Sequence, residues 1–150
     1  MTTGRHALRG AREIALIRSL QHDVATADAA RARRNTEEAE RIHREGLAAL
    51  EEEERRWSGV LAGPMLDLDL MAIRAHALIE SERSANGFAA DRARSEAERD
   101  AKMSALGRAD AAATASTEHV RIERRRNVAR REEARLADAA DHHLMRAVSR

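Results

Sequence analysis

The chain has 150 residues, of which 33 are alanine, 35% are charged and only Trp57 and Phe88 are aromatic, and its formal net charge is +1. This composition is typical of long helices and coiled coils, and Leu, Ile, Val and Phe together supply only 25 residues, too few for a thick globular core. No cysteine is present, which excludes a disulfide framework, a cysteine-ligated zinc site and a thiol nucleophile.

The single proline of the chain, Pro64, divides two long segments that are almost free of helix-breaking residues. The sequence therefore predicts an all-α fold in which residues 1–150 form one long, two-helix antiparallel coiled-coil hairpin with unequal arms. The first helix is expected over about 7–60, the turn over about 61–65 and the second helix over about 66–147. Acid–base pairs four residues apart favour the first helix, for example Glu37–Arg41, Glu51–Arg55 and Glu52–Arg56.

Side-chain size along the two segments favours antiparallel packing. A turn centred on residues 62 and 63 brings together positions whose numbers sum to about 125. Residues 25–41 contain no apolar side chain larger than alanine. In this register they face residues 84–100, which are similarly poor in large apolar side chains. Large residues reappear together on either side, and we expect Ile17, Leu20 and Val24 to pack on Met103 and Leu106. At the hinge, Trp57 and Leu61 are expected to pack on Leu66, Leu68 and Leu70.

The same register pairs Leu8 with Thr117, so that about 30 residues of the second helix project beyond the first. This projecting segment contains an arginine-rich stretch and then an apolar stripe formed by Leu136, Ala140, Leu144 and Val148. A helix with an unburied apolar stripe is typically an interaction element. A frayed, solvated C-terminal helix is the alternative interpretation.

No catalytic, cofactor or metal site is expected. The chain has neither a glycine-rich phosphate loop nor a nucleophile elbow, and two helices alone offer no active-site concavity. The nearest potential metal ligands, Asp138 and His142, lack a third ligand. The arginines of 121–135 alternate with glutamates and have no aromatic residues near them, which does not favour nucleic-acid binding.

Because the chain has no cysteine, a cytoplasmic location is the simplest expectation. No run of about 18 apolar residues could span a membrane, and the N-terminal residues lack the apolar stretch of a signal peptide.

Trp57-Ser58-Gly59, at the expected bend, has the W-x-G form found in small secreted helical hairpins of the ESX export pathway. A secreted protein of this kind, or a coiled coil that simply dimerises, is therefore one functional interpretation. A tryptophan that closes the end of a hairpin before a glycine-mediated turn is the purely structural interpretation of the same motif.

A second resemblance covers the whole chain. Residues 123–141 combine a basic run, glutamates, Leu136 and the acids Asp138 and Asp141, and Leu66, Leu70 and Ile73 follow the turn. In these features, and in its unequal arms, the chain resembles the FliJ/YscO family, the stalk proteins of flagellar and injectisome type III protein export. Asp138 and Asp141 stand apart where the family has adjacent acids, so the choice between the flagellar and injectisome systems stays open.

The resemblance implies a non-enzymatic stalk that inserts into a hexameric export ATPase and also contacts the export gate and export chaperones. It implies a cytoplasmic protein that is peripheral at the export apparatus of the inner membrane. On this basis the ATPase-binding residues are expected to be Arg121, Arg124, Arg125, Arg131, Arg135 and Leu136. The gate-binding residues are expected to be Leu66, Leu70 and Ile73.

Overall fold

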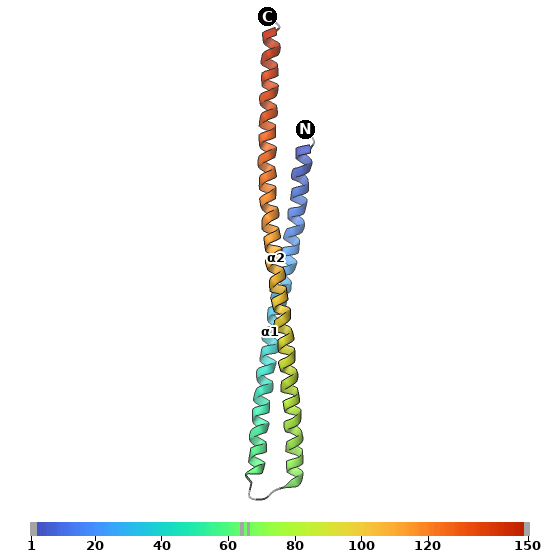
Figure 1. Cartoon of the computed structure of the whole chain (residues 1–150), viewed down its shortest axis with the longest axis vertical. Helices are drawn as coiled ribbons and strands as arrows, with labels where there is room; N and C mark the ends of the chain where they lie inside the picture. The colour runs from blue at the N-terminus through green and yellow to red at the C-terminus, as the bar shows by residue number, and fades with distance from the viewer. Residues whose placement is uncertain (1–2, 64, 66, 149–150) are drawn as a thin grey trace. The chain divides into compact units, whose positions relative to one another are not determined.

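The computed structural model describes residues 3–63, 65 and 67–148, with the side chains of 3–4, 142–144 and 146–148 left undescribed. Two helices, α1 (Thr3–Leu61) and α2 (Leu68–Val148), account for nearly all of this part, which contains no strand (Figure 1). The predicted all-α helical hairpin is therefore confirmed. By internal contacts the chain separates into two units, and in each a segment of α1 packs on a segment of α2. Unit 1 comprises Met1–Thr26 with Ala105–Arg150, and unit 2 is the continuous segment Ala27–Ser104.

The loop between the helices is longer than the sequence indicated. At its start, the amide of Ala62 donates to the carbonyl of Ser58 at 3.1 Å and closes α1. At its end, the Asp67 carboxylate accepts hydrogen bonds from the amides of Asp69 and Leu70, each at 3.0 Å. Such an N-terminal cap is worth about 1 kcal/mol, and it places the beginning of α2 after residue 67. Pro64 itself lies outside the described residues.

The W-x-G motif does not lie at the bend. α1 continues through Trp57, Ser58 and Gly59 to Leu61, and an added Cβ on Gly59 would meet no atom within 4 Å. The motif lies in the last turns of α1, and the loop begins only at residue 62.

The longer loop changes the register of the helices. In unit 2, Asp28 Oδ2 accepts a hydrogen bond from Lys102 Nζ at 2.9 Å, and Thr36 Oγ1 lies 3.1 Å from the carbonyl oxygen of Ser95. In unit 1, His22 Nε2 lies 3.7 Å from an oxygen of Asp110. The numbers of these contacting residues add to 130, 131 and 132, so the predicted sum of about 125 is too low by five to seven residues, or roughly one and a half to two helical turns.

The centre of unit 2 is held by small side chains, as the alanine-rich segments predicted. Ala29, Ala32 and Ala85 are 2–4% exposed, and Thr36 is equally buried. The Thr36 hydroxyl donates to the carbonyl of Ala32, at 3.0 Å on its own helix, and also reaches the carbonyl of Ser95 on α2. A side chain as short as threonine reaches the opposite backbone only where two helices approach closely, so methyl-sized residues set the separation here.

Phe88 interrupts this seam of small residues, and a glycine on the other helix accommodates it. A Cβ added to Gly46 would lie 2.5 Å from Cδ2 and 3.0 Å from Cε2 of the Phe88 ring. Gly46 is itself buried. The ring therefore occupies the space that any other residue at position 46 would fill.

The predicted packing of large residues in unit 1 is wrong. Ile17, Leu20 and Val24 are 54%, 57% and 64% exposed, whereas Ala11 is 3% exposed. The seam of unit 1 follows α1 positions that include Ala11 and His22, and the large aliphatic residues lie roughly 180° around the helix from these positions. Because contact with a single neighbouring helix covers only one side of α1, the large residues stay outside.

Local ion pairs along α1 agree in part with the sequence. Both Glu51–Arg55 and Glu52–Arg56 form, at 3.6 Å and 3.0 Å. Arg41, however, pairs with Glu38 and Glu45, each at 2.5 Å, instead of with Glu37. The pairs are exposed to solvent, so each contributes little to stability.

The ion pair between Asp28 and Lys102 joins the two helices of unit 2. The hydrogen bond and charge of Lys102 lower the pKa of Asp28 below its usual 3.8, and Asp28 in turn raises the pKa of Lys102 above its usual 10.5. A lowered carboxyl pKa contributes stability that is lost as pH falls through it, and a raised ammonium pKa contributes stability that is lost as pH rises through it. The pair therefore stabilises this register over the whole pH range from the usual pKa of Asp, 3.8, to the usual pKa of Lys, 10.5.

A disulfide in this cysteine-free chain distinguishes the two registers. Because Thr36 contacts the backbone of Ser95, we expect Thr36→Cys with Ser95→Cys to oxidise within one monomer. The matched control is Thr36→Cys with Ala89→Cys, two positions that would face each other in the predicted register, in which the numbers of facing residues add to 125. It should stay reduced, since position 89 lies about 9 Å further along α2 and disulfides need Cα atoms within about 7 Å. Non-reducing electrophoresis reads the result, and efficient bridging of 36 with 89 would contradict the register.

Candidate interaction surfaces

The C-terminal part of α2 extends beyond the start of α1 by less than expected. In the register of unit 1, set by His22 and Asp110, Thr3 at the beginning of α1 is level with about residue 129 of α2. The projecting segment is therefore about 129–148, and the expectation of about 30 residues, with Leu8 opposite Thr117, is wrong. The sum in unit 1 is seven residues larger than predicted, which shortens the projection by seven residues, and the earlier start of α1 shortens it further.

This register divides the six predicted ATPase-binding residues into two groups. Arg121, Arg124 and Arg125 lie along the part of α2 that is level with α1. Arg131, Arg135 and Leu136 lie on the projecting segment.

Two polar residues of α2 lie buried in unit 1. Glu123 and Asn127 are 6% and 9% exposed. The Glu123 carboxylate accepts a hydrogen bond from Arg126 at 2.7 Å and lies 4.0 Å from Arg130. In the sequence, Glu123 is one of the glutamates that alternate with the arginines of 121–135, and its burial was not expected. The available signal was its spacing, because Glu123 and Asn127 continue the seam positions of Ser116 and Val120 at intervals of three and four residues.

The predicted arginines differ in whether they have partners. Arg121 pairs with Glu118 at 3.0 Å. The other four are exposed and form no ion pair with any residue in the described part of the chain: Arg124, Arg125, Arg131 and Arg135. Four guanidinium groups are thus available for carboxylates of another molecule.

These arginines occupy two faces of α2. Arg124, Arg131 and Arg135 recur at intervals of seven and four residues and therefore share one face, with the half-exposed Val128 between them. Arg125 and Leu136 are eleven residues, or about three turns, apart and share a different face. Leu136 is 71% exposed. The first face, named here the arginine face, consists of Arg124, Arg131 and Arg135.

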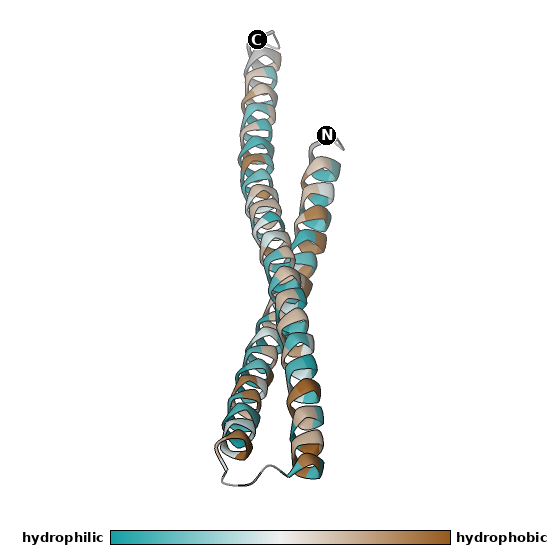
Figure 2. Cartoon of the chain, turned by 60° about the horizontal axis from the view of Figure 1, so that its bottom comes forward, coloured by the Kyte–Doolittle hydropathy of each residue, from teal (hydrophilic) through white to brown (hydrophobic). Residues whose placement is uncertain are grey.

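The hinge end presents apolar side chains instead of closing over them. Leu61, Leu68 and Leu70 are 48%, 76% and 38% exposed, so the expected packing of Leu61 on Leu68 is wrong. Trp57 is half-buried. Figure 2 shows strongly hydrophobic turns of both helices next to the loop. Of the predicted gate-binding residues, Ile73 is 64% exposed and Leu70 is the least exposed, while Leu66 lies outside the described residues.

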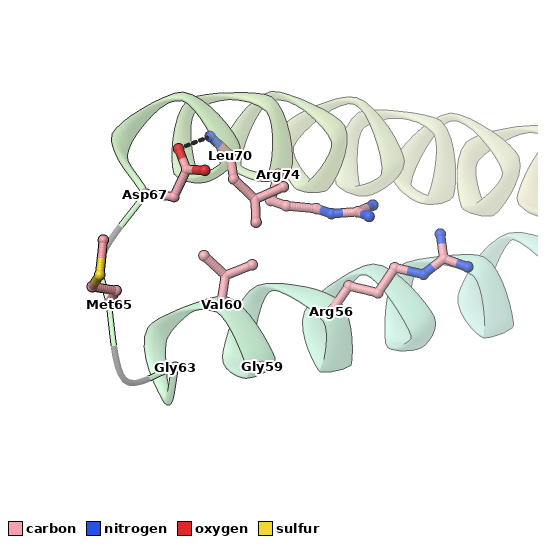
Figure 3. Close-up of a pocket in the computed structure, with 8 residues that line it drawn as sticks. All are labelled: Arg56, Gly59, Val60, Gly63, Met65, Asp67, Leu70 and Arg74. Atoms are coloured by element: carbon pink, nitrogen blue, oxygen red, sulfur yellow. Dashed lines mark hydrogen bonds between the residues drawn. The ribbon is translucent and has the colours of Figure 1, made fainter.

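A cavity of about 320 Å³ opens between the helices at this end. In Figure 3 the side chains of Val60 and Leu70 point toward each other across it from α1 and α2. The complete lining is Arg56, Gly59, Val60, Gly63, Met65, Asp67, Leu70 and Arg74.

The two arginines of the cavity are compensated by two acids. Arg56 pairs with Glu52 at 3.0 Å and with Glu53 at 2.6 Å, and Arg74 lies 3.6 Å from the other oxygen of Glu53. The cavity thus combines an apolar floor with nearly neutral walls. Such a site suits an apolar side chain of a partner protein better than an anion.

Comparison with protein-family models, curated proteins and solved structures gave no match to this chain. Within the described residues there is no cluster of three or more potential metal ligands; the side chain of His142 is not among them. Nor does either helix, over its described residues, contain an apolar stretch of the length needed to cross a membrane. The exposed surfaces of the two helices are therefore the features from which a function is argued.

Proposed function

We propose that this chain is a non-enzymatic coiled-coil stalk of a type III or flagellar protein export apparatus. The proposal rests on the resemblance of its sequence to the FliJ/YscO family. The observation that carries it is the arginine face of α2, where three exposed guanidiniums without partners in the described residues lie in line toward the C-terminal end. A line of cations on a stiff helix complements a ring or cleft with an acidic lining.

In this proposal the end of α2 inserts into the hexameric export ATPase. Arg124, Arg131 and Arg135 pair with carboxylates of the ring, and Arg125 and Leu136 contact it from the second face. Arg121 contributes less than the others, because Glu118 already compensates its charge.

The hinge end is then the surface for the export gate. Leu70 and Ile73, with Leu66, offer apolar contact there, and the cavity beside Leu70 accepts one apolar side chain of the gate or of an export chaperone. This assignment locates the chain in the cytoplasm, at the inner membrane only through its partners.

Charge reversal on the arginine face tests the ATPase assignment. We expect Arg124→Glu with Arg131→Glu to weaken binding to the export ATPase of the same organism by at least about tenfold, since two attractive contacts become repulsive. Stimulation of ATP hydrolysis should fall in parallel. The measurements are pull-down and steady-state ATPase assays with the purified proteins.

A matched control is Arg33→Glu with Arg34→Glu, two exposed arginines of α1 outside the C-terminal segment. This variant should bind and stimulate as the unaltered chain does. Unchanged binding and stimulation in the arginine-face variant would refute the stalk assignment.

The alternative function is a secreted or dimerising coiled coil, and one observation favours dimerisation: the exposed Ile17, Leu20 and Val24 of α1. Dimerisation through these residues would leave the arginine face free, so it is compatible with the stalk.

A further inference from the structure

One side of α1 in unit 1 is apolar and exposed. Five large aliphatic residues between positions 14 and 24 are 52–64% exposed: Ile14, Leu16, Ile17, Leu20 and Val24. With 100° between successive residues, Leu16, Ile17, Leu20 and Val24 fall within about 100° of one another on the side away from the seam that contains Ala11, and Ile14 lies at the edge of this face, about 60° from Ala11. This face is named here the aliphatic stripe. Five such residues within eleven positions exceed the scattered apolar exposure that is normal for a surface.

We infer that the aliphatic stripe is a contact surface for a second copy of this chain, related by a two-fold axis that pairs the two stripes antiparallel. A two-fold contact requires a surface that is complementary to itself. The stripe meets this requirement in its apolar residues, which are centred near residue 18, and in the charges beside it.

The charges beside the stripe are complementary in one orientation only. Arg12 and Asp23 are eleven residues apart, so they lie on the same flank of the helix, nearly equidistant from residue 18. An antiparallel two-fold pairing brings Arg12 of each copy against Asp23 of the other, twice. In a parallel pairing these residues would be separated by about 16 Å along the axis and could not meet.

Both charged groups are available for this contact. Arg12 is exposed and forms no ion pair with a described residue of its own chain. The Asp23 side chain is 71% exposed, and its nearest side-chain neighbour in an ion-pair geometry is the imidazole Nδ1 of His22, at 3.6 Å. The nearby Arg9 and Glu13 already compensate each other at 2.9 Å.

The mixed charge also identifies the kind of partner. A helix that binds an anionic lipid surface carries lysine and arginine around its apolar face, whereas Glu13 and Asp23 adjoin this stripe. The stripe is only about 16 Å long, which is small for a specific protein contact. We therefore expect a dimer that dissociates in the micromolar range.

Sedimentation velocity of the full chain over a concentration series tests the inference. The unaltered chain should pass from monomer to dimer, and Leu20→Glu should remain monomeric at every concentration with unchanged helix content by circular dichroism. Ile79→Glu is the matched control, because Ile79 is as exposed, at 54%, but lies outside the stripe; its dimerisation should be unaffected.

Charge exchange tests the orientation. Arg12→Asp alone and Asp23→Arg alone should each weaken the dimer roughly tenfold, and the double variant Arg12→Asp with Asp23→Arg should recover most of the affinity. Failure of the double variant to recover would overturn the antiparallel pairing.

A chain that stays monomeric at all concentrations would overturn the inference, whether or not the stripe then binds another protein or lipid vesicles. So would a dimer insensitive to Leu20→Glu. The inference does not rest on the stalk function, because Leu20→Glu leaves the arginine face intact. Loss of dimerisation with full ATPase stimulation would thus separate the two proposals.

Discussion

Replacing Ala32 with leucine is expected to destabilise the chain by about 1–3 kcal/mol, although leucine is the more hydrophobic residue and forms helices nearly as well. Ala32 is 3% exposed, and nearby Thr36 reaches the backbone of α2. Three additional carbon atoms have no space unless the helices separate and the hydrogen-bonded contact of Thr36 is lost. The measurement is the midpoint of urea unfolding followed by circular dichroism.

Ala48→Leu is the matched control for this experiment. Ala48 is an exposed residue of the same helix, so the substitution should change stability by no more than about 0.5 kcal/mol. Equal effects at positions 32 and 48 would mean that the small residues do not set the separation of the helices.

Gly46→Ala is expected to destabilise unit 2 by roughly 1–2 kcal/mol, against the gain of about 1 kcal/mol that alanine brings to a helix. The new Cβ would lie 2.5 Å from the ring of Phe88, so the ring must leave its position and lose its contacts. Gly87→Ala, where an added Cβ meets no atom within 4 Å, should instead stabilise the chain by about 1 kcal/mol.

A second background decides whether the ring is the cause. In a Phe88→Ala chain the ring no longer occupies this space. Gly46→Ala should then stabilise the chain by about 1 kcal/mol, because alanine favours a helix more than glycine does. If Gly46→Ala destabilises both backgrounds equally, the close approach of Phe88 is not what requires a glycine at position 46.

The sequence predicted the architecture well because its strongest signals are local. High alanine content, alternating acids and bases and one proline dictate two helices regardless of how they pack. The register is not local. It depended on where the loop ends, and the decisive residue was Asp67, whose carboxylate caps α2. A negative charge at Asp67 favours any helix that starts nearby, and only its capping position places that start beyond residue 66.

The packing of Ile17, Leu20 and Val24 was mispredicted for a different reason. Matching large residues with large ones assumes that every large apolar side chain enters the intramolecular seam. Alanine seams compete with them, because small side chains allow a closer approach of the backbones and place larger residues on the outer side. The arginines of the candidate ATPase surface were easier to place, since a charged side chain without a local partner stays exposed.

The close fit between Gly46 and Phe88 has a consequence for how firmly the helices of unit 2 are aligned. A row of methyl groups is nearly uniform, so sliding one helix by a heptad would again bring methyl against methyl at little energetic cost. The Phe88 ring, however, meets a residue without a side chain at Gly46, and Lys102 meets the carboxylate of Asp28 in the same alignment. These two contacts occur once along the seam, so they select one alignment among several that the alanines alone would tolerate.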